Sequence, residues 1–273
     1  MSLSTPQPMP NGKVTYATDG GLALLTLTNP PANGYSYEMM RDLDEAVLRA
    51  RFDEAVQVLV LAGAGEKFFC AGADIAMLDA VTANFKYAFC LHANETLLRL
   101  EHTPKLVIAA LGGHCVGGGL EIALAADLRF ARHASGKCGL PEISLGVLPG
   151  TGGTQRLARV VGKAKAIELM TSGELFDYEA AEKLGLVNRV LAARDEGEFL
   201  AQVFELARGY CTPKKASMAV GHIKRAVQTG LEIPLEAGLA LERELQARLF
   251  ASTDAKEGIA AFVQKRPALF QGR

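Results

Sequence analysis

Two apolar, β-branched runs that each end in a glycine-rich loop place the strongest constraint on the fold of this chain. Val56–Ala62 is followed by Gly63–Gly65, and Leu106–Leu111 is followed by Gly112–Gly119. Runs of this length and composition are typical of strands that are buried on both faces of a parallel sheet. The second loop opens a helical stretch that continues to about Ala126. Strands therefore alternate with helices, and the sequence predicts an α/β fold.

The predicted elements change from mixed to purely helical near residue 200. Upstream, Ser36 is positioned to cap a helix, and a strand–strand–helix rhythm recurs without the fixed period of a solenoid. Downstream, Leu235–Phe250 carries apolar residues at helical spacing. We therefore expect an α/β core with the active site over residues 13–200. A helical region over residues 201–273 is expected to serve as the oligomerisation surface.

The charge balance argues against partners that are recognised by a basic surface. The 273 residues carry a formal net charge of −1. This gives no electrostatic case for binding nucleic acid or an anionic membrane. The longest apolar runs, such as Leu106–Leu111, are too short to cross a bilayer. Met1–Gly12 is polar and contains three prolines, so we expect it to be disordered or loosely attached.

The cysteines and the N-terminal residues predict a cytoplasmic protein. Five cysteines are scattered without CxxC spacing, at Cys70, Cys90, Cys115, Cys138 and Cys211. Such a set suits buried thiols in a reducing compartment better than a disulfide framework. No charged segment followed by an apolar stretch is visible at the N-terminus, so no secretory signal is expected.

Several kinds of site are disfavoured by their incomplete motifs. Gly63-x-Gly65-x-x-Phe68 lacks the third glycine of a dinucleotide-binding loop. His92 and His114 each lie near a cysteine, but nothing completes a four-ligand set at the spacing of a zinc site, so no metal is expected. No Gly-x-Ser-x-Gly elbow supports a covalent mechanism.

Glu121 and Glu142 are the two carboxylates that stand out, although neither is convincing alone. Glu121 lies two residues after a glycine run, in the first turn of a predicted helix, where the helix dipole alone favours a negative charge. Glu142 follows Pro141 in an otherwise apolar stretch and, taken alone, is interpreted as a solvated loop carboxylate.

Four segments in a fixed order place these two glutamates within recognisable motifs. The segments are Phe69–Ile75, Gly117–Asp127, Gly139–Glu142 and Leu148–Leu157, with a further match at Phe262–Arg266. Together they resemble the enoyl-CoA hydratase/isomerase (crotonase) family, and within it the hydratases with two glutamates. The resemblance covers about residues 13–270. It implies a crotonase-like spiral of repeated β-β-α units with a helical C-terminal region, assembled as a trimer or as a hexamer of two trimers.

The resemblance also implies a reaction, the addition of water to a trans-2-enoyl-CoA to give 3-hydroxyacyl-CoA. The backbone amides of Ala73 and Gly118 are expected to form an oxyanion hole for the thioester enolate. Glu121 is expected to deprotonate the attacking water, and Glu142 to deliver a proton to the α-carbon. The amide of Gly150 is expected to help position the water. Coenzyme A is part of the substrate, and no other cofactor is implied.

Further residues are expected, from the same resemblance, to contact the acyl-CoA. They are Ala32, Ala71, Asp74, Ile75, Gly117 and Pro141. Lys265 could reach a CoA phosphate, including one bound to a neighbouring subunit, although a solvated lysine is an equally good interpretation.

Two other functions stay open at this point, and the chain departs from the family pattern in places. The alternatives are a Δ3,Δ2-enoyl-CoA isomerase and a non-catalytic relative that binds acyl-CoA or RNA. Phenylalanine is common in the family where this chain has Cys138, and lysine where it has Ala76. Gly34 and Tyr35 are also unusual. Tyr35 or Tyr37 could shape the acyl or pantetheine channel, although packing or surface roles are favoured.

Overall fold

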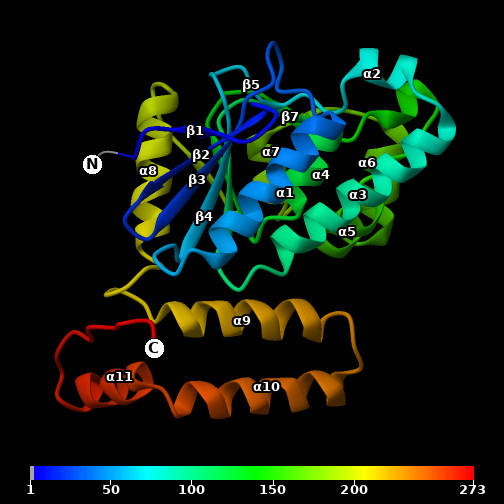
Figure 1. Cartoon of the computed structure of the whole chain (residues 1–273). Helices are drawn as coiled ribbons and strands as arrows, with labels where there is room; N and C mark the ends of the chain where they lie inside the picture. Colours follow the sequence, from blue (N-terminus) through cyan, green and yellow to red (C-terminus); the bar gives the residue numbers. More distant parts are fainter. Residues whose placement is uncertain (1–2) are drawn as a thin grey trace.

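The computed structural model describes residues 3–273, and its α/β part is built on two sheets (Figure 1). The larger sheet has the strand order β1-β2-β3-β4-β6-β8-β11, and β3 through β11 run parallel. Its strands are β1 (Gln7–Pro8), β2 (Val14–Asp19), β3 (Leu22–Leu27), β4 (Val58–Gly63), β6 (Leu106–Leu111), β8 (Leu128–Arg132) and β11 (Arg189–Leu191). The smaller sheet has the order β10-β9-β7-β5. Its strands are β5 (Phe68–Cys70), β7 (His114–Val116), β9 (Lys137–Gly139) and β10 (Phe176–Asp177).

The strands and helices repeat as β-β-α units, which confirms the predicted spiral. In each unit the first strand joins the larger sheet and the second joins the smaller one, and a helix follows. The units are β4-β5-α3, β6-β7-α4 and β8-β9-α5, with α2 inserted before α3 and a short 3-10 helix before α5. The bounds are α2 (Ile75–Ala80), α3 (Ala83–Glu101), α4 (Gly118–Leu124), the 3-10 helix Glu142–Leu145 and α5 (Gly153–Val161). Because the second strands run parallel, the turns that follow β5 and β7 meet at one edge of the smaller sheet.

The central strands are buried on both faces, as their composition predicts. Leu59 and Leu61 of β4 belong to an apolar core shared with α1 (Tyr37–Phe52), α3 and α4. Val58 and Val60 face a second core, which α8 (Glu196–Arg208) closes with Phe199 and other buried side chains. This alternation follows from the two-residue period of side chains along a strand.

The N-terminal segment is attached more firmly than its sequence predicts. Residues 1–2 lie outside the described part of the chain, but β1 pairs with β2 and Met9 is buried. The carboxylate of Asp42, itself fully buried, accepts hydrogen bonds from the backbone and side-chain nitrogens of Asn11, at 2.9 and 2.8 Å. The prediction of a loose segment is therefore wrong for residues 3–12. The error arises because this order comes from tertiary hydrogen bonds rather than from local propensity.

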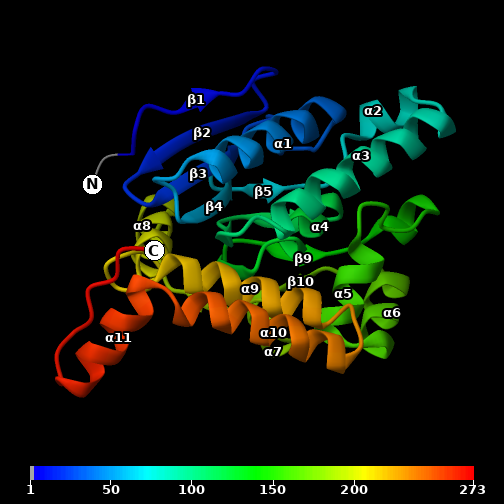
Figure 2. The ribbon, with the colours of Figure 1, turned by 60° about the horizontal axis from the view of Figure 1, so that its bottom comes forward.

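The C-terminal helices extend away from the sheets, and Figures 1 and 2 show α9 lying between the α/β core and α10. The remaining helices are α6 (Lys163–Ser172), α7 (Tyr178–Lys183), α9 (Ser217–Gly230), α10 (Leu235–Phe250) and α11 (Thr253–Val263). The boundary predicted at residue 200 falls inside α8, which packs on the larger sheet. A buried ion pair of 2.8 Å between Lys224 of α9 and Asp127 ties α9 to the core. No helix in residues 3–273 is long and apolar enough to span a membrane.

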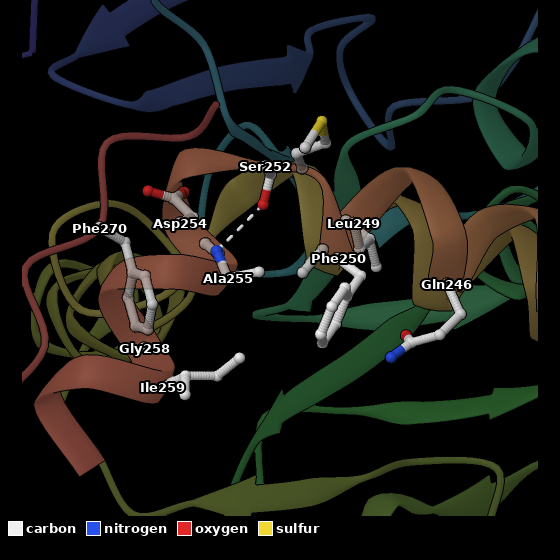
Figure 3. A pocket seen from close by; sticks show the side chains of 12 residues that line it. Gln246, Leu249, Phe250, Ser252, Asp254, Ala255, Gly258, Ile259 and Phe270 are labelled. Carbon is white, nitrogen blue, oxygen red and sulfur yellow. Dashed lines mark hydrogen bonds between the residues drawn. The ribbon is translucent and has the colours of Figure 1, made fainter. Parts of the chain in front are cut away.

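A hollow of about 410 Å³ lies among the C-terminal helices (Figure 3). Phe250, Ile259 and Phe270 give it apolar walls. Two of its polar groups are already engaged. The hydroxyl of Ser252 accepts a hydrogen bond from the backbone N–H of Ala255 (3.0 Å). The carboxylate of Asp254 accepts hydrogen bonds from two backbone amides of the C-terminal segment. This hollow therefore presents packing surface rather than reactive groups.

Candidate active site

A cleft of about 620 Å³ collects most of the residues that the sequence singles out. It lies where the turns after β5 and β7 meet, and the 3-10 helix and the loop before α5 form its opposite wall. The predicted residues that line it are Ala71, Ala73, Ile75, Gly117, Gly118, Glu121, Pro141, Glu142 and Gly150. Side chains between α2 and α5, among them Leu78, Leu145 and Leu148, complete a largely apolar surface.

Three predicted residues lie outside this cleft. Ala32 and Asp74 line an adjoining hollow of about 250 Å³, which shares Ala71 and Ala73 with the cleft. The Asp74 carboxylate caps α2 by accepting a hydrogen bond from the backbone N–H of Met77 (3.1 Å). Lys265 lines neither hollow and follows the last turn of α11. The chain's own fold therefore does not bring Lys265 to the cleft.

Two backbone amides lie close together at the cleft and are unpaired in the described part of the chain. Gly72, with φ of +93°, turns the chain after β5, and a Cβ atom placed on it would lie 3.4 Å from the amide nitrogen of Gly118. The turn that carries Ala73 and the start of α4 are therefore adjacent. Within residues 3–273, neither the Ala73 nor the Gly118 amide donates a hydrogen bond. Unpaired amides at a cleft and at a helix N-terminus can stabilise negative charge on a ligand.

Glu121 is a buried carboxylate that three donors hold in place. Its Oε1 accepts hydrogen bonds from the backbone N–H groups of Thr151 (2.7 Å) and Gly153 (2.8 Å). Its Oε2 accepts a hydrogen bond from the Thr151 hydroxyl. These three donors fix the side chain at the cleft wall.

Glu142 occupies a different environment at the start of the 3-10 helix. Its Oε2 is buried and has no hydrogen-bond partner among the described residues. The pKa of Glu142 is raised to about 7, chiefly by desolvation and also by the negative charge of Glu121, while its own backbone N–H and Lys86 act to lower it. A carboxyl group with a pKa near neutrality can donate a proton at physiological pH.

Thr151 and Gly153 hold the carboxylate of Glu121, and reasoning from the sequence did not single them out. Both belong to the segment Leu148–Leu157, which was recognised only as a family motif. The family resemblance implies the amide of Gly150 as the donor to the water, and Gly150 does line the cleft. The signal was the run of glycines around Thr151, because glycine permits the close approach of backbone amides to a carboxylate.

The histidines contribute no cluster of ligands. His114 accepts a hydrogen bond from the backbone N–H of Lys137 (3.1 Å), and His92 packs edge-on to Tyr37. No group of three or more His, Cys, Asp or Glu side chains in residues 3–273 is placed to hold a metal ion.

The cleft of this α/β spiral thus combines unpaired backbone amides with two carboxyl groups in unlike environments, a set of groups that can bind negative charge and exchange protons. Comparison with known proteins identifies the family. The model of the enoyl-CoA hydratase/isomerase family matches residues 17–273. A probable enoyl-CoA hydratase of Rhizobium meliloti is 42% identical over 257 residues, which cover 94% of this chain and 96% of the relative. The crotonyl-CoA hydratase of Syntrophomonas wolfei is 35% identical, with 91% and 94% covered.

Solved structures agree with this assignment. The crystal structure of an enoyl-CoA hydratase from Geobacillus kaustophilus superposes with a TM-score of 0.92 at 42% identity, covering 100% of this chain and 99% of that one. The chain therefore belongs to the enoyl-CoA hydratase/isomerase family of enzymes. It has the crotonase fold that the sequence predicts.

Proposed function

We propose that this enzyme hydrates trans-2-enoyl-CoA thioesters to 3-hydroxyacyl-CoA. One observation carries the proposal: a hydrogen-bonded carboxylate, Glu121, and an unpartnered carboxyl group, Glu142, line the same cleft as the free amides of Ala73 and Gly118. The names of the relatives from Rhizobium meliloti and Syntrophomonas wolfei support the same reaction.

The two amides would act on the thioester oxygen. When water adds to the β-carbon, negative charge develops on this oxygen as the enolate forms. The N–H groups of Ala73 and Gly118 would donate hydrogen bonds to it where the charge appears, and the start of α4 adds its positive dipole end. The loss of one oxyanion-hole donor costs roughly 3 kcal/mol of barrier in an enzyme where it has been removed.

The two glutamates would divide the proton transfers. The water oxygen bonds to the β-carbon while one of its protons passes to Glu121, and Glu142 gives its proton to the α-carbon. The amide of Gly150 would help to orient the water. The substrate gains H and OH, one glutamate gains a proton and the other loses one, so the reaction balances without an oxidant. We therefore propose that no redox cofactor or metal is required beyond the CoA carried by the substrate.

The acyl-CoA would lie along the cleft and its adjoining hollow. We propose contacts from Ala71, Ile75, Gly117 and Pro141 in the cleft, and from Ala32 and Asp74 in the hollow. Lys265 would contact the CoA only from a neighbouring subunit.

Self-association into a trimer or hexamer is part of the proposal. Large apolar side chains on and beside the C-terminal helices are exposed, including Leu231 (78%) and Phe262 (86%). Burying such surface in an interface is favourable. Analytical ultracentrifugation would support the proposal if it gives three or six chains, and a monomer at micromolar concentration would overturn it.

We also propose a cytoplasmic location. All five cysteines lie in the described part of the chain and all are free thiols, four of them buried. Free thiols are the expected state in a reducing compartment.

The decisive experiment follows the ultraviolet absorbance of the enoyl thioester when purified protein meets crotonyl-CoA. Rapid loss of absorbance that Glu142→Gln abolishes supports hydration. Glu168→Gln is the matched control, because Glu168 lies on an exposed face of α6 and pairs only with Lys165. Faster turnover of a 3-enoyl-CoA would identify an isomerase instead. Tight binding of crotonyl-CoA without turnover of either substrate would identify a non-catalytic binder.

A further inference from the structure

Tyr35 touches both of the backbone turns that carry the free amides. Its backbone N–H donates a hydrogen bond to the carbonyl oxygen of Gly72 (2.9 Å), and its carbonyl oxygen accepts one from the N–H of Asp74 (3.1 Å). These two bonds form a parallel bridge around Ala73. The bridge fixes the peptide planes on either side of Ala73, and thereby the direction of its amide.

The ring of the same residue lies against the second turn. A Cβ atom placed on Gly118 would lie 1.7 Å from Cε1 of Tyr35. The ring is therefore in direct contact with the backbone of Gly118, and glycine is required there. Phe89 of α3 supports the ring from another side, with 5.5 Å between the ring centroids. The side chain is 3% exposed, so packing restricts its movement.

The hydroxyl group of Tyr35 lies near Glu121 and Thr151. Burial and the negative charge of Glu121 raise the pKa of Tyr35, while the nearby Thr151 hydroxyl lowers it. The phenol therefore stays neutral at physiological pH. Tyr35 also lines the cleft.

We propose that Tyr35 is a positioning residue that sets the separation and direction of the Ala73 and Gly118 amides. This inference rests on the proposed function, in which these amides bind the thioester oxygen. The backbone of Tyr35 fixes the amide of Ala73, and its ring packs against Gly118 and sets the position of that amide. A ring-sized gap beside Gly118 would let the start of α4 move toward Phe89, and a misplacement of about 1 Å at a reacting group can cost on the order of 100-fold in rate.

The test uses a CoA thioester of 4-(dimethylamino)cinnamic acid. The absorbance of this chromophore shifts to longer wavelength when its carbonyl oxygen is polarised by hydrogen bonds. The wild-type enzyme should shift the band, and Tyr35→Leu should lose most of the shift. Its kcat with crotonyl-CoA should fall about 100-fold while KM changes much less. Tyr35→Phe, which keeps the ring and the backbone, should retain most of the shift.

Control variants separate this role from a loss of folding. Tyr37→Leu removes a neighbouring ring that also packs on Phe89, with centroids 6.4 Å apart, and it should retain the wild-type shift. If Tyr35→Leu does not fold, Tyr35→Met keeps the volume without a planar ring and should show the same loss.

Each remaining outcome has a distinct meaning. A wild-type shift that survives in Tyr35→Leu or Tyr35→Met would overturn the inference and leave the proposed function standing. A loss of the shift in Tyr35→Phe as large as in Tyr35→Leu would also overturn it, because the hydroxyl rather than the ring would then set the geometry. Binding of the chromophore to wild-type enzyme without any shift would overturn the proposed oxyanion hole itself.

Discussion

The carboxylate of Glu121 and the backbone amide of Thr151 are joined by a hydrogen bond of 2.7 Å across 30 positions of sequence. The Thr151 hydroxyl donates to the other oxygen of the same carboxylate. One short loop before α5 therefore donates hydrogen bonds to both carboxylate oxygens of a side chain that belongs to α4. These hydrogen bonds restrict the rotamer of Glu121.

Removing the hydroxyl of Thr151 tests the importance of the hydrogen bonds to Glu121. Thr151→Val keeps the shape of the side chain and the backbone amide, but it removes one donor to Glu121. A hydrogen bond to a charged group contributes roughly 1.5–3 kcal/mol, so kcat/KM for crotonyl-CoA should fall about 10- to 100-fold. Thr154→Val is the control, because the Thr154 hydroxyl only accepts a hydrogen bond from the side chain of its neighbour Gln155. Equal kinetics for the two variants would contradict the prediction.

The pH dependence of the reaction should report the proton on Glu142. Desolvation raises its pKa to about 7, and the proposed mechanism requires the protonated form. The titration of Glu142 in the free enzyme should therefore leave kcat/KM constant below pH 7 and make it fall tenfold per pH unit above pH 7. A profile of initial rates with crotonyl-CoA measures this directly. A rise in kcat/KM between pH 7 and pH 9 would show that Glu142 acts in its ionised form.

The same shift predicts how Glu142 affects stability. Its folded-state pKa of about 7 lies above the ordinary value of 4.5, so the folded chain binds this proton more tightly than the unfolded chain. The resulting stabilisation is complete below pH 4.5 and is lost as the pH rises through about 7. Glu142→Gln stays neutral throughout. Relative to wild type, its Tm should therefore rise more at pH 8.5 than at pH 5, as differential scanning fluorimetry can measure. An equal difference at both values would contradict the prediction.

The ion pair between Lys224 and Asp127 should contribute strongly to the attachment of α9. Lys224 is almost fully buried, and its Nζ also donates to the carbonyl oxygen of Lys105 (3.0 Å). Lys224→Met leaves the Asp127 carboxylate without its counter-charge, which should lower the free energy of unfolding by about 3–5 kcal/mol in urea titrations. Lys214→Met breaks an exposed pair with Glu205 and should cost less than about 1 kcal/mol. Similar losses for the two variants would contradict this account.

Elements with strong local signals were predicted well from the sequence. Leu235–Phe250 was expected as a helix and Leu106–Leu111 as a strand, and both have those bounds in the structure. Ser36 caps α1 as expected, with its hydroxyl accepting a hydrogen bond from the backbone N–H of Met39. Periodicity and capping are properties of a few consecutive residues, so they can be predicted from one sequence. The ordered attachment of Asn11 could not be predicted, because its hydrogen-bond partner Asp42 lies 31 positions away.

The site was predictable to the extent that its parts are sequence motifs. The glycines mark the turns, and Glu121 and Glu142 do line one cleft. The roles assigned to these residues stay predictions. The donors to Glu121 and the contact of Tyr35 with Gly118 could not be deduced, because they depend on how separate β-β-α units stack. Lys265 lies away from the cleft of its own chain, so its expected contact requires a second subunit.

The donors proposed for the oxyanion belong to the main chain, whereas other parts of the cleft wall are side chains on exposed elements. Ile75 of α2 and Leu148 before α5 are 61% and 67% exposed. Substitutions there alter the shape offered to an acyl group without disturbing the glycine turns or the three donors on Glu121. Substitutions can therefore change the choice of acyl group while the residues proposed for the chemistry stay the same. A lineage that inherits this scaffold can acquire a new substrate by changing the wall alone.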